Sequence, residues 1–387
     1  MRPLIVITSL GAGGAERSTA DFLDYARRRG MSPTVACLYR REGVHDEVVR
    51  NGLDVRILSG RGLAAKSRSL RSLIAELKPD LVHTAIFEAD VIGRIAAISG
   101  PPVLSSLVNA SYDPIRLQDP NIRRWRLEVT RIVEALMARI LTTHFHAVSS
   151  AVKRSAVTQL RLPEERITVI ERGRDPRKLG QRSLERRSRV RHALGIADEA
   201  PVLLNVGRQE FQKGQKYLLL ALRRIILDHP ETVLLLAGRE GLSSPDLDHV
   251  LNESGIAGHV RILGHRDDVP DLLAAADLFV FPSLYEGIGG AVIEAMGLSL
   301  PIVGSDLPAL RELIHDGQNG ILVPIQSPQE LADAIVHLLD DPGHAQALGT
   351  RGREIFLERF TAEHAHDRLA GLYEKIAGCG RTARIKA

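Results

Sequence analysis

The sequence contains little cysteine and no long apolar segment. Among its 387 residues there are only two cysteines, Cys37 and Cys379. Two cysteines so far apart provide neither a disulfide framework nor the ligand spacing of a metal site, which favours a reducing compartment. The apolar run that follows Pro3 ends at Ser9, and no later run is long enough to cross a bilayer. We therefore expect a cytoplasmic protein that is at most peripherally bound to the inner face of the cytoplasmic membrane.

Aromatic residues are also scarce, at 4% of the sequence, and the net charge is only +4. The positive charge is concentrated between Arg116 and Arg191, where 19 Lys and Arg residues stand against 8 Asp and Glu residues. A basic segment of this size can contact anionic lipid headgroups or an acidic acceptor, although ordinary solvated helix faces explain it equally well. The segment contains one Trp, one Phe and no recognisable nucleic-acid-binding module, so we expect no nucleic-acid partner.

Short apolar segments alternate with helical patterns along the whole chain, which is long enough for two domains. The first apolar segment, Leu4–Thr8, leads through a glycine loop into a helical pattern, which is how a βαβ unit begins. After a polar, Arg-rich connection that starts at Asp175, a second series of strands begins at Val202–Val206. The pattern predicts an α/β protein of two Rossmann-like domains, residues 1–177 and 178–360, facing each other across a deep cleft.

The glycine loop after the first strand does not match the dinucleotide fingerprint. Counting from Gly11, the position of the third required glycine is occupied by Glu16. A nicotinamide or flavin is therefore disfavoured, and we expect no cofactor. The loop nevertheless follows the carboxyl end of a strand, where open parallel sheets bind ligands, so Gly13 and Gly14 are candidate ligand contacts.

The stretch 281–298, FPSLYEGIGGAVIEAMGL, combines two carboxylates, a glycine-rich turn and an expected helix start, and it begins at the last residue of the apolar strand 278–281. Its glycines form a turn, and a helix is expected to begin near Gly290, where unpaired amides and the helix dipole can hold a phosphate. Glu286 lies before this phosphate site and Glu294 lies about one turn inside the helix. The two carboxylates therefore flank the site and can accept hydrogen bonds from sugar hydroxyls. The alternative is a loop acid and an ordinary first-turn acid.

A second motif follows the strand 202–206. Arg208 and Lys213 are five residues apart in a loop at the carboxyl edge of the predicted sheet. Two fixed cations there can clamp a diphosphate and stabilise the charge that grows on it as a leaving group. The alternative is that both side chains are simply solvated.

Together these two motifs resemble glycosyltransferase family 4, which carries an E-x7-E signature and a GR-x4-KG motif in this order. The resemblance implies a retaining enzyme of the GT-B fold, with Glu294 on the donor ribose, Glu286 on the transferred sugar, and Arg208 and Lys213 on the diphosphate. It also implies that the C-terminal helix, residues 361–387, crosses back onto the acceptor-binding N-terminal domain, while the C-terminal domain binds the donor. The implied catalytic residues are Glu286, Arg208 and Lys213. The full donor-binding set implied is Gly13, Gly14, Arg208, Lys213, Arg266, Glu286, Gly289, Gly290, Ala291 and Glu294.

On the first domain the sequence departs from the family pattern. Many members carry a histidine after the strand that corresponds to Val103–Val108, but here the residue is Asn109. Asparagine can hydrogen-bond a sugar hydroxyl but cannot accept a proton. His83 and His146, each at a predicted strand end, are assigned with Asn109 to the acceptor or sugar side, and the alternative is that both are structural histidines.

The resemblance implies a hexosyltransferase that moves a sugar from a UDP- or GDP-linked donor to an acceptor hydroxyl in glycan, glycolipid or natural-product biosynthesis. The acceptor is a carbohydrate, a lipid-linked compound or a small molecule, and the donor is a substrate, not a cofactor. Because no D-x-D follows a predicted strand, we expect no metal. Peripheral association with an anionic membrane through residues 116–191 is a further expectation.

Three other classes remain to be compared with this one. A nucleotide-sugar 2-epimerase of the same fold requires acids and histidines on the first-domain face, where Asn109 leaves no obvious set. A glycogen-type phosphorylase requires a lysine-bound pyridoxal phosphate in a much longer chain. A non-catalytic protein that binds a sugar nucleotide stays open as an alternative.

Overall fold

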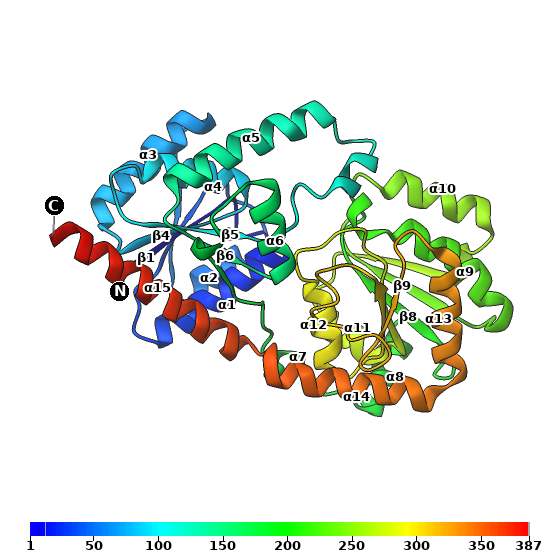
Figure 1. The fold of residues 1–387 in the computed structure, drawn as a ribbon. Helices are drawn as coiled ribbons and strands as arrows, with labels where there is room; N and C mark the ends of the chain where they lie inside the picture. Colours follow the sequence, from blue (N-terminus) through cyan, green and yellow to red (C-terminus); the bar gives the residue numbers. More distant parts are fainter. Residues whose placement is uncertain (12, 386–387) are drawn as a thin grey trace. The chain divides into compact units, whose positions relative to one another are not determined.

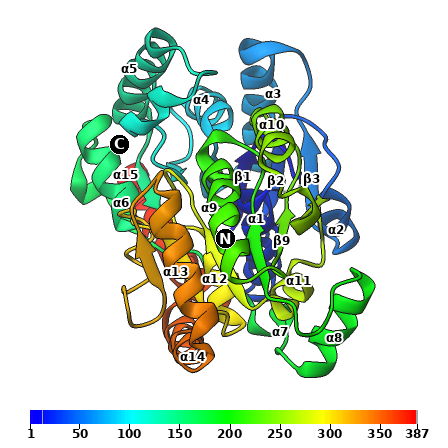
Figure 2. The ribbon, with the colours of Figure 1, turned by 90° about the vertical axis from the view of Figure 1, so that its right-hand side faces the viewer.

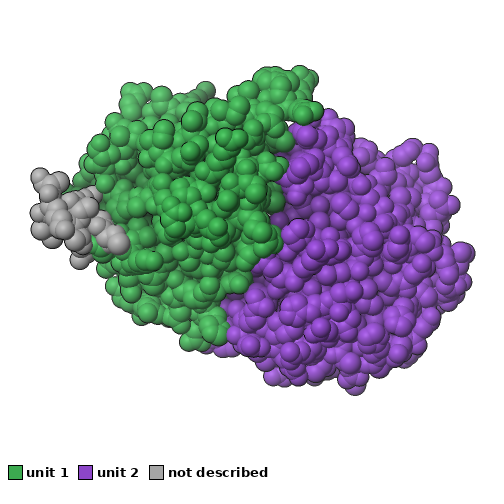
Figure 3. Space-filling view, viewed as in Figure 1, with its two compact units in different colours: residues 1–112, 123–172, 362–387 green, residues 113–122, 173–361 purple. Residues whose placement is uncertain are grey.

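The computed structural model describes residues 1–11 and 13–385, which form two compact units (Figures 1 and 3). Unit 1 comprises Met1–Tyr112, Arg123–Arg172 and Ala362–Ala387, and unit 2 comprises Asp113–Ile122 and Gly173–Thr361. No helix in the described part of the chain is long and apolar enough to cross a membrane. Each unit is built on one parallel sheet, as the alternation of strands and helices predicts.

Unit 1 contains a seven-stranded sheet in the order β3-β2-β1-β4-β5-β6-β7. Its strands are β1 Pro3–Ile7, β2 Thr34–Cys37, β3 Asp54–Ile57, β4 Leu81–Ala85, β5 Val103–Leu107, β6 His144–Ala147 and β7 Ile167–Val169. Its helices are α1 Gly14–Arg28, α2 His45–Arg50, α3 Gly62–Leu77, α4 Phe87–Ala96, α5 Arg124–Leu141, α6 Ser150–Gln159 and α15 Ala362–Ile385. All strand pairs are parallel, which requires helices on both faces.

Alternate residues of β1 face two separate cores. Leu4 and Val6 pack with α3 and α4, whereas Ile5 and Ile7 pack with α1 and α15 on the other face (Figure 1). A strand that is apolar at every position is therefore explained by burial on both sides. The C-terminal helix α15 contributes Tyr373 to the second core, so it is part of unit 1. Residues 386–387 of the expected tail helix and the side chain of Cys379 lie outside the described residues.

Unit 2 contains a six-stranded parallel sheet in the order β10-β9-β8-β11-β12-β13. Its strands are β8 Val202–Val206, β9 Val233–Ala237, β10 Val260–Gly264, β11 Leu278–Phe281, β12 Ile302–Ser305 and β13 Ile321–Val323. Its helices are α7 Pro176–Leu179, α8 Leu184–Ala193, α9 Gln215–Asp228, α10 Ser244–Ser254, α11 Val269–Ala275, α12 Gly290–Gly297, α13 Pro328–Asp340 and α14 Pro342–Arg359. Helices α9 and α13 lie side by side on one face and share an aliphatic core with β9 (Figure 2). The prediction of two Rossmann-like domains is confirmed.

The unit boundaries differ from the predicted residues 1–177 and 178–360 in three places, the smallest being that unit 2 ends at Thr361. Asp113–Ile122 belongs to unit 2, because the Arg116 guanidinium lies 5.7 Å from the centre of the Tyr285 ring and Gln326 Nε2 donates to Gln118 Oε1 at 2.9 Å. The chain also enters unit 2 at Gly173, several residues before the predicted boundary. The contacts that hold Asp113–Ile122 in unit 2 cannot be predicted from the local sequence.

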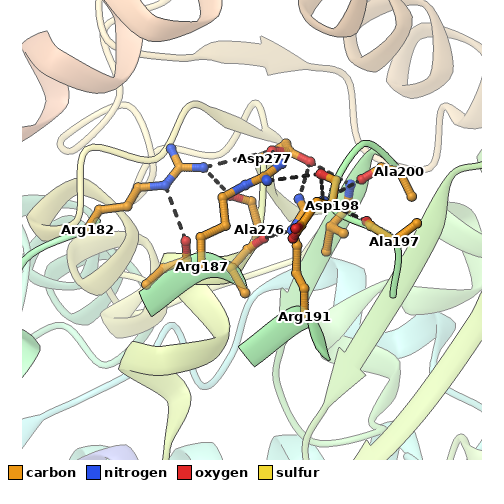
Figure 4. A network of polar contacts seen from close by, with 11 residues as sticks. Arg182, Arg187, Arg191, Ala197, Asp198, Ala200, Ala276 and Asp277 are labelled. Carbon is orange, nitrogen blue, oxygen red and sulfur yellow. Dashed lines mark hydrogen bonds and ion pairs between the residues drawn. The ribbon is translucent and has the colours of Figure 1, made fainter. Parts of the chain in front are cut away.

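The arginines of the basic segment 116–191 do not form one face. In unit 2, the guanidinium groups of Arg182, Arg187 and Arg191 converge on Asp277, with Arg191 Nη2 2.6 Å from Oδ2 (Figure 4). Arg191 is fully buried and also donates to the backbone carbonyls of residues 197, 198 and 200, while Asp277 accepts from the Val202 amide at 2.8 Å. These arginines join α8 and the segment just before it to Asp277 and to the start of β8, so their charges are engaged inside unit 2 and do not contribute to an exposed basic face.

Candidate functional site

The strand order of the unit 2 sheet reverses at β8, which has β9 on one side and β11 on the other. Leu203 pairs with Leu278 and Leu204 pairs with Phe279, so the carboxyl ends of β8 and β11 lie next to each other. Open α/β sheets bind ligands at such a switch point. The two motifs singled out in the sequence follow these two strands, and the structure therefore brings them to one place.

The loops after β8 and β11 are joined by two hydrogen bonds, one between backbones and one from a side chain. The Leu284 amide donates to the Gln212 carbonyl at 2.8 Å, and Gln212 Nε2 donates to the Tyr285 carbonyl at 2.9 Å. Gly214 makes this approach possible, since its φ is +60° and a Cβ built on it would lie 2.0 Å from the Pro282 carbonyl oxygen. No other residue fits there without moving one of the two loops.

The first contact between the motifs is an ion pair. Lys213 Nζ lies 2.5 Å from Glu286 Oε1, and the same oxygen accepts from Ser283 Oγ at 2.9 Å. The Lys213 ammonium also lies 5.0 Å from the centre of the Phe281 ring. The Glu286 side chain is 8% exposed and that of Lys213 is 19% exposed, so the pair is held in a largely water-excluded place. A cation restrained in this way is already oriented before a ligand arrives.

The second acidic residue of the signature has an unexpected partner. Arg174 Nε donates to Glu294 Oε1 at 2.6 Å, with the two side chains 10% and 20% exposed. A Cβ built on Gly290 would lie 2.5 Å from Arg174 Nη2, so the guanidinium lies over the first turn of α12. Arg174 was missed in the sequence because it stands in a run of arginines with nothing to distinguish it.

Helix α12 begins after Gly289, whose φ is +82°. Among the described residues, no side chain caps its first turn. The amides of Gly290 and Ala291, the first helical positions, and the dipole of the helix leave a positive end beside the Arg174 guanidinium. This end of α12 has the electrostatic character of an anion site, with the cationic Lys213 on the neighbouring loop.

Arg208 and Arg266 are not drawn into these contacts. The Arg208 side chain is 60% exposed, and its nearest acidic partner is Glu210 at 3.7 Å. Arg266 makes two bonds to Asp268, of 2.7 and 2.5 Å, and this guanidinium lowers the pKa of the Asp268 carboxyl below its usual range. Arg266 follows β10, two strand spacings, or about 10 Å, from β8. Both arginines lie at the carboxyl edge of the sheet, where a long ligand can reach them.

In unit 1, the predicted glycines lie at the start of α1, with Gly13 at its N-cap position. A Cβ on Gly14 would lie 3.3 Å from Arg172 Nη1. Asn109 follows β5, is partly exposed, and accepts through its own side chain from the Ala110 amide at 2.9 Å. The structure thus places a polar side chain at Asn109, but not one that can accept a proton.

His83 and His146 are interior residues in a chain of hydrogen bonds. The chain runs from the Tyr373 hydroxyl to His83 Nδ1 (2.5 Å), from His83 Nε2 to Ser106 Oγ (2.7 Å), from Ser106 Oγ to His146 Nδ1 (2.8 Å), and from His146 Nε2 to the Ile170 carbonyl (2.8 Å). Because a carbonyl only accepts, His146 must donate from Nε2, Ser106 must donate to His146, His83 must donate from Nε2, and Tyr373 must donate to His83.

Burial lowers the pKa of His83 to about 3 and that of His146 to about 4. Both rings are therefore neutral near pH 7, with every ring nitrogen engaged. The chain joins α15 to β4, β5 and β6. This is the arrangement of structural histidines, so the structure speaks against their assignment to the acceptor or sugar side.

Two further features concern metals and thiols. In the residues that the structure describes, no group of three or more His, Cys, Asp or Glu side chains could hold a metal ion. Cys37 lies buried in β2, and burial raises its thiol pKa to about 12. This thiol is therefore protonated at neutral pH and a poor nucleophile.

Two family models match the chain over most of its length. Glycosyltransferase Family 4 matches residues 12–178, and Glycosyl transferases group 1 matches residues 200–341. The alpha-D-kanosaminyltransferase of Streptomyces kanamyceticus is 32% identical over 193 residues, which are 49% of this chain and 50% of that protein. An Escherichia coli UDP-Gal:alpha-D-GlcNAc-diphosphoundecaprenol alpha-1,3-galactosyltransferase is 26% identical over 277 residues, 70% of each chain. The chain spans about half the length of the first of these and of several other curated relatives.

A solved structure shares the fold across both units. HepE of Anabaena, crystallised with UDP and glucose, superimposes with a TM-score of 0.86 and 24% identity, covering 97% of this chain and 99% of that one.

Proposed function

Because the chain belongs to glycosyltransferase family 4 and has the GT-B fold, we propose that it transfers a hexose-like sugar from a nucleoside diphosphate sugar to an acceptor hydroxyl. The observation that carries this proposal is the meeting of the two motifs at the switch point of unit 2. The ion pair of Lys213 with Glu286 and the N-terminal turn of α12 with Arg174 together provide cationic groups for a diphosphate and carboxylates for sugar hydroxyls.

The diphosphate of the donor binds between Lys213 and the first amides of α12. Both groups are positive and oriented before the ligand arrives, so they stabilise the charge that develops on the departing diphosphate with little rearrangement. Arg208 is exposed and adds a third cation when it turns towards the phosphates. Positive side chains and a helix end then supply the charge that a divalent ion supplies elsewhere, so the reaction is independent of metal.

The two carboxylates hold the two sugars of the donor. Glu294 accepts from the ribose hydroxyls, and Arg174 neutralises it, which lowers the repulsion between this carboxylate and the nearby diphosphate. Glu286 accepts from a hydroxyl of the transferred sugar while it holds Lys213 in place. The base, uracil or guanine, lies towards β10 and Arg266.

The reaction retains the anomeric configuration. The acceptor oxygen forms its bond to the anomeric carbon on the face from which the diphosphate leaves, the bond from that carbon to the phosphate oxygen breaks, and the acceptor proton moves to an oxygen of the leaving diphosphate. No protein base is needed in this sequence. A mechanism without a protein base is compatible with Asn109, which cannot accept a proton, and with two histidines whose nitrogens are already occupied.

The acceptor is a carbohydrate, a lipid-linked compound or a small molecule in glycan, glycolipid or natural-product biosynthesis. The protein acts in the cytoplasm and associates peripherally with an anionic membrane. The support for this association is the exposed arginines of the segment that precedes and includes α5, since those of α8 are paired within unit 2.

The test is incubation of the purified protein with UDP-, GDP- and dTDP-linked sugars. We expect slow release of the nucleoside diphosphate from one donor, and a loss on the order of 10²-fold in Lys213→Ala. Lys216→Ala, an exposed lysine in the first turn of α9, is the matched control and should keep its activity. Interconversion of the donor sugar would indicate a 2-epimerase instead, and tight binding without turnover would indicate a binding protein.

A further inference from the structure

Helix α5 carries an apolar stripe that faces away from the interior of unit 1. Six of the 18 large apolar side chains that are exposed in the described part of the chain lie on this helix, with exposures from 43% to 76%. They are Trp125, Val129, Ile132, Val133, Leu136 and Ile140. Their spacing places all six within a sector of about 100° on the helix surface. The stripe therefore runs along the whole exposed side of α5.

The orientation of this stripe is set by contacts on the opposite side of the helix. Glu134 and Ala138 are buried, and Glu134 accepts a hydrogen bond from the Tyr112 hydroxyl. Arg131 Nη1 donates to the Gln159 carbonyl at 2.8 Å, and α5 packs against α4 (Figure 1). An amphipathic helix in a globular domain normally turns its apolar side to the core. Here the polar anchors face inwards and the apolar stripe faces solvent.

The charges beside the stripe are positive. Arg123, Arg124, Arg126 and Arg139 are exposed, and Arg126 lies 5.3 Å from the centre of the Trp125 ring. The acidic Glu128 is paired with Arg131 at 2.8 Å. The exposed side of α5 thus combines a continuous apolar surface with arginines and an aromatic ring.

We propose that α5 lies flat in the headgroup region of an anionic bilayer, with the stripe inserted among the upper acyl chains and the arginines on lipid phosphates. Helices that lie in the interface have this composition, with a basic polar margin and an aromatic residue at headgroup level. The helix is 18 residues, or about 27 Å, long, and its arginines exclude a transmembrane position.

The charges also select the bilayer over a second copy of the chain. Two α5 helices packed stripe to stripe would bring their exposed arginines together, with Glu128 of each helix already neutralised. That arrangement is repulsive, whereas lipid phosphates complement the arginines. This inference rests on the membrane association proposed above, names the element that makes it, and is independent of the identity of the donor.

The full-length protein offers a direct probe, because Trp125 is the only tryptophan in the sequence. With vesicles of equal parts phosphatidylglycerol and phosphatidylcholine, we expect a blue shift of its emission, quenching by lipids brominated near the headgroup, and co-sedimentation of the protein. Vesicles of phosphatidylcholine alone should bind more weakly, and added salt should weaken binding to the anionic vesicles.

Variants separate insertion from general surface effects. Ile132→Asp with Leu136→Asp should lower vesicle partitioning by about tenfold or more, because each loses an inserted side chain and adds a negative charge. The matched control is Leu184→Asp with Leu227→Asp, two exposed leucines on α8 and α9, which should bind as the unmodified protein does. Donor hydrolysis without vesicles should be unchanged in both double variants, so failure of the membrane inference and failure of the proposed activity are distinguishable.

Three results would overturn the inference: an unshifted Trp125 emission with anionic vesicles, equal binding by the α5 variant and its control, or a dimer in sedimentation analysis that the α5 variant dissociates. The last result would assign the stripe to contact between copies of the chain.

Discussion

Replacing Lys213 by Met should lower both the free energy of unfolding and the turnover. A second substitution, Glu286→Gln, should restore only the first of these. The ammonium of Lys213 lies 2.5 Å from Glu286 Oε1, and the side chains are 19% and 8% exposed. Breaking a fully buried pair costs about 3–5 kcal/mol because the remaining charge loses its partner. The residual exposure of Lys213 and the Ser283 hydroxyl bond to Glu286 reduce this cost, so we expect a loss of about 2–3 kcal/mol in the free energy of unfolding.

The double variant Lys213→Met with Glu286→Gln removes both charges at once. Its free energy of unfolding should return to within about 1 kcal/mol of the unmodified protein, because no uncompensated charge stays buried. Turnover should not return, and should stay on the order of 10²-fold below the unmodified protein, because the diphosphate still lacks its cation. The second substitution would then restore stability without restoring activity.

The assay pairs denaturant unfolding, followed by circular dichroism, with release of the nucleoside diphosphate. Lys216→Met serves as the control for loss of an exposed lysine in the same helix-loop region. A single Lys213→Met variant that unfolds at the same denaturant concentration as the control would refute the argument from burial. A double variant that regains turnover would refute the role of Lys213 as the diphosphate cation.

Four other predictions follow from the described contacts. Because the folded-state pKa values of His83 and His146 are about 3 and about 4, the unfolded chain binds more protons below pH 6.5, so unfolding experiments should show stability falling by up to about 1.4 kcal/mol per pH unit for each histidine as the pH drops from 6.5 towards 4. Gly214→Ala should cost about 2 kcal/mol or more in thermal or denaturant unfolding, since φ is +60° and the added Cβ would strike a carbonyl oxygen; an unchanged midpoint would contradict the close approach of the two loops. Glu294→Ala should weaken donor binding by about tenfold in calorimetry, whereas Arg174→Ala should weaken it and also destabilise the fold. If both variants bound the donor as tightly as the unmodified protein, these residues would not belong to the site. Turnover should survive EDTA, and a loss that Mg²⁺ or Mn²⁺ restores would contradict metal independence.

Much of the fold was accessible from local sequence. Strands such as β1, predicted at Leu4–Thr8 and observed at Pro3–Ile7, and β8 at Val202–Val206 are recognisable because burial on both faces of a parallel sheet demands apolar runs. The glycine turn before Gly290 and the start of the following helix are also local, since they depend on backbone freedom and on helix-end chemistry. These features need no knowledge of the rest of the chain.

The partners of the site residues were not accessible in this way. Lys213 and Glu286 are 73 residues apart and meet only because β8 and β11 are neighbours in the sheet. Arg174 is one of many arginines in its segment. Only the structure shows that its guanidinium lies against the first turn of α12. From the sequence, His83 and His146 could be recognised only as residues at the ends of predicted strands. The tertiary structure shows that their nitrogens are occupied, by Tyr373 of α15, by Ser106 and by the Ile170 carbonyl.

By itself, then, the amino-acid order determined where strands, glycine turns and helices form and which residues carry charge, because those properties depend on neighbours along the chain. The tertiary structure decided which charges meet and which faces stay in water. Arginines on α8 and α5 look alike in the sequence, yet those on α8 end against Asp277 and those beside Trp125 face solvent. Electrostatic energy and apolar burial depend on distance in space, and the packing of the sheet and its helices sets that distance.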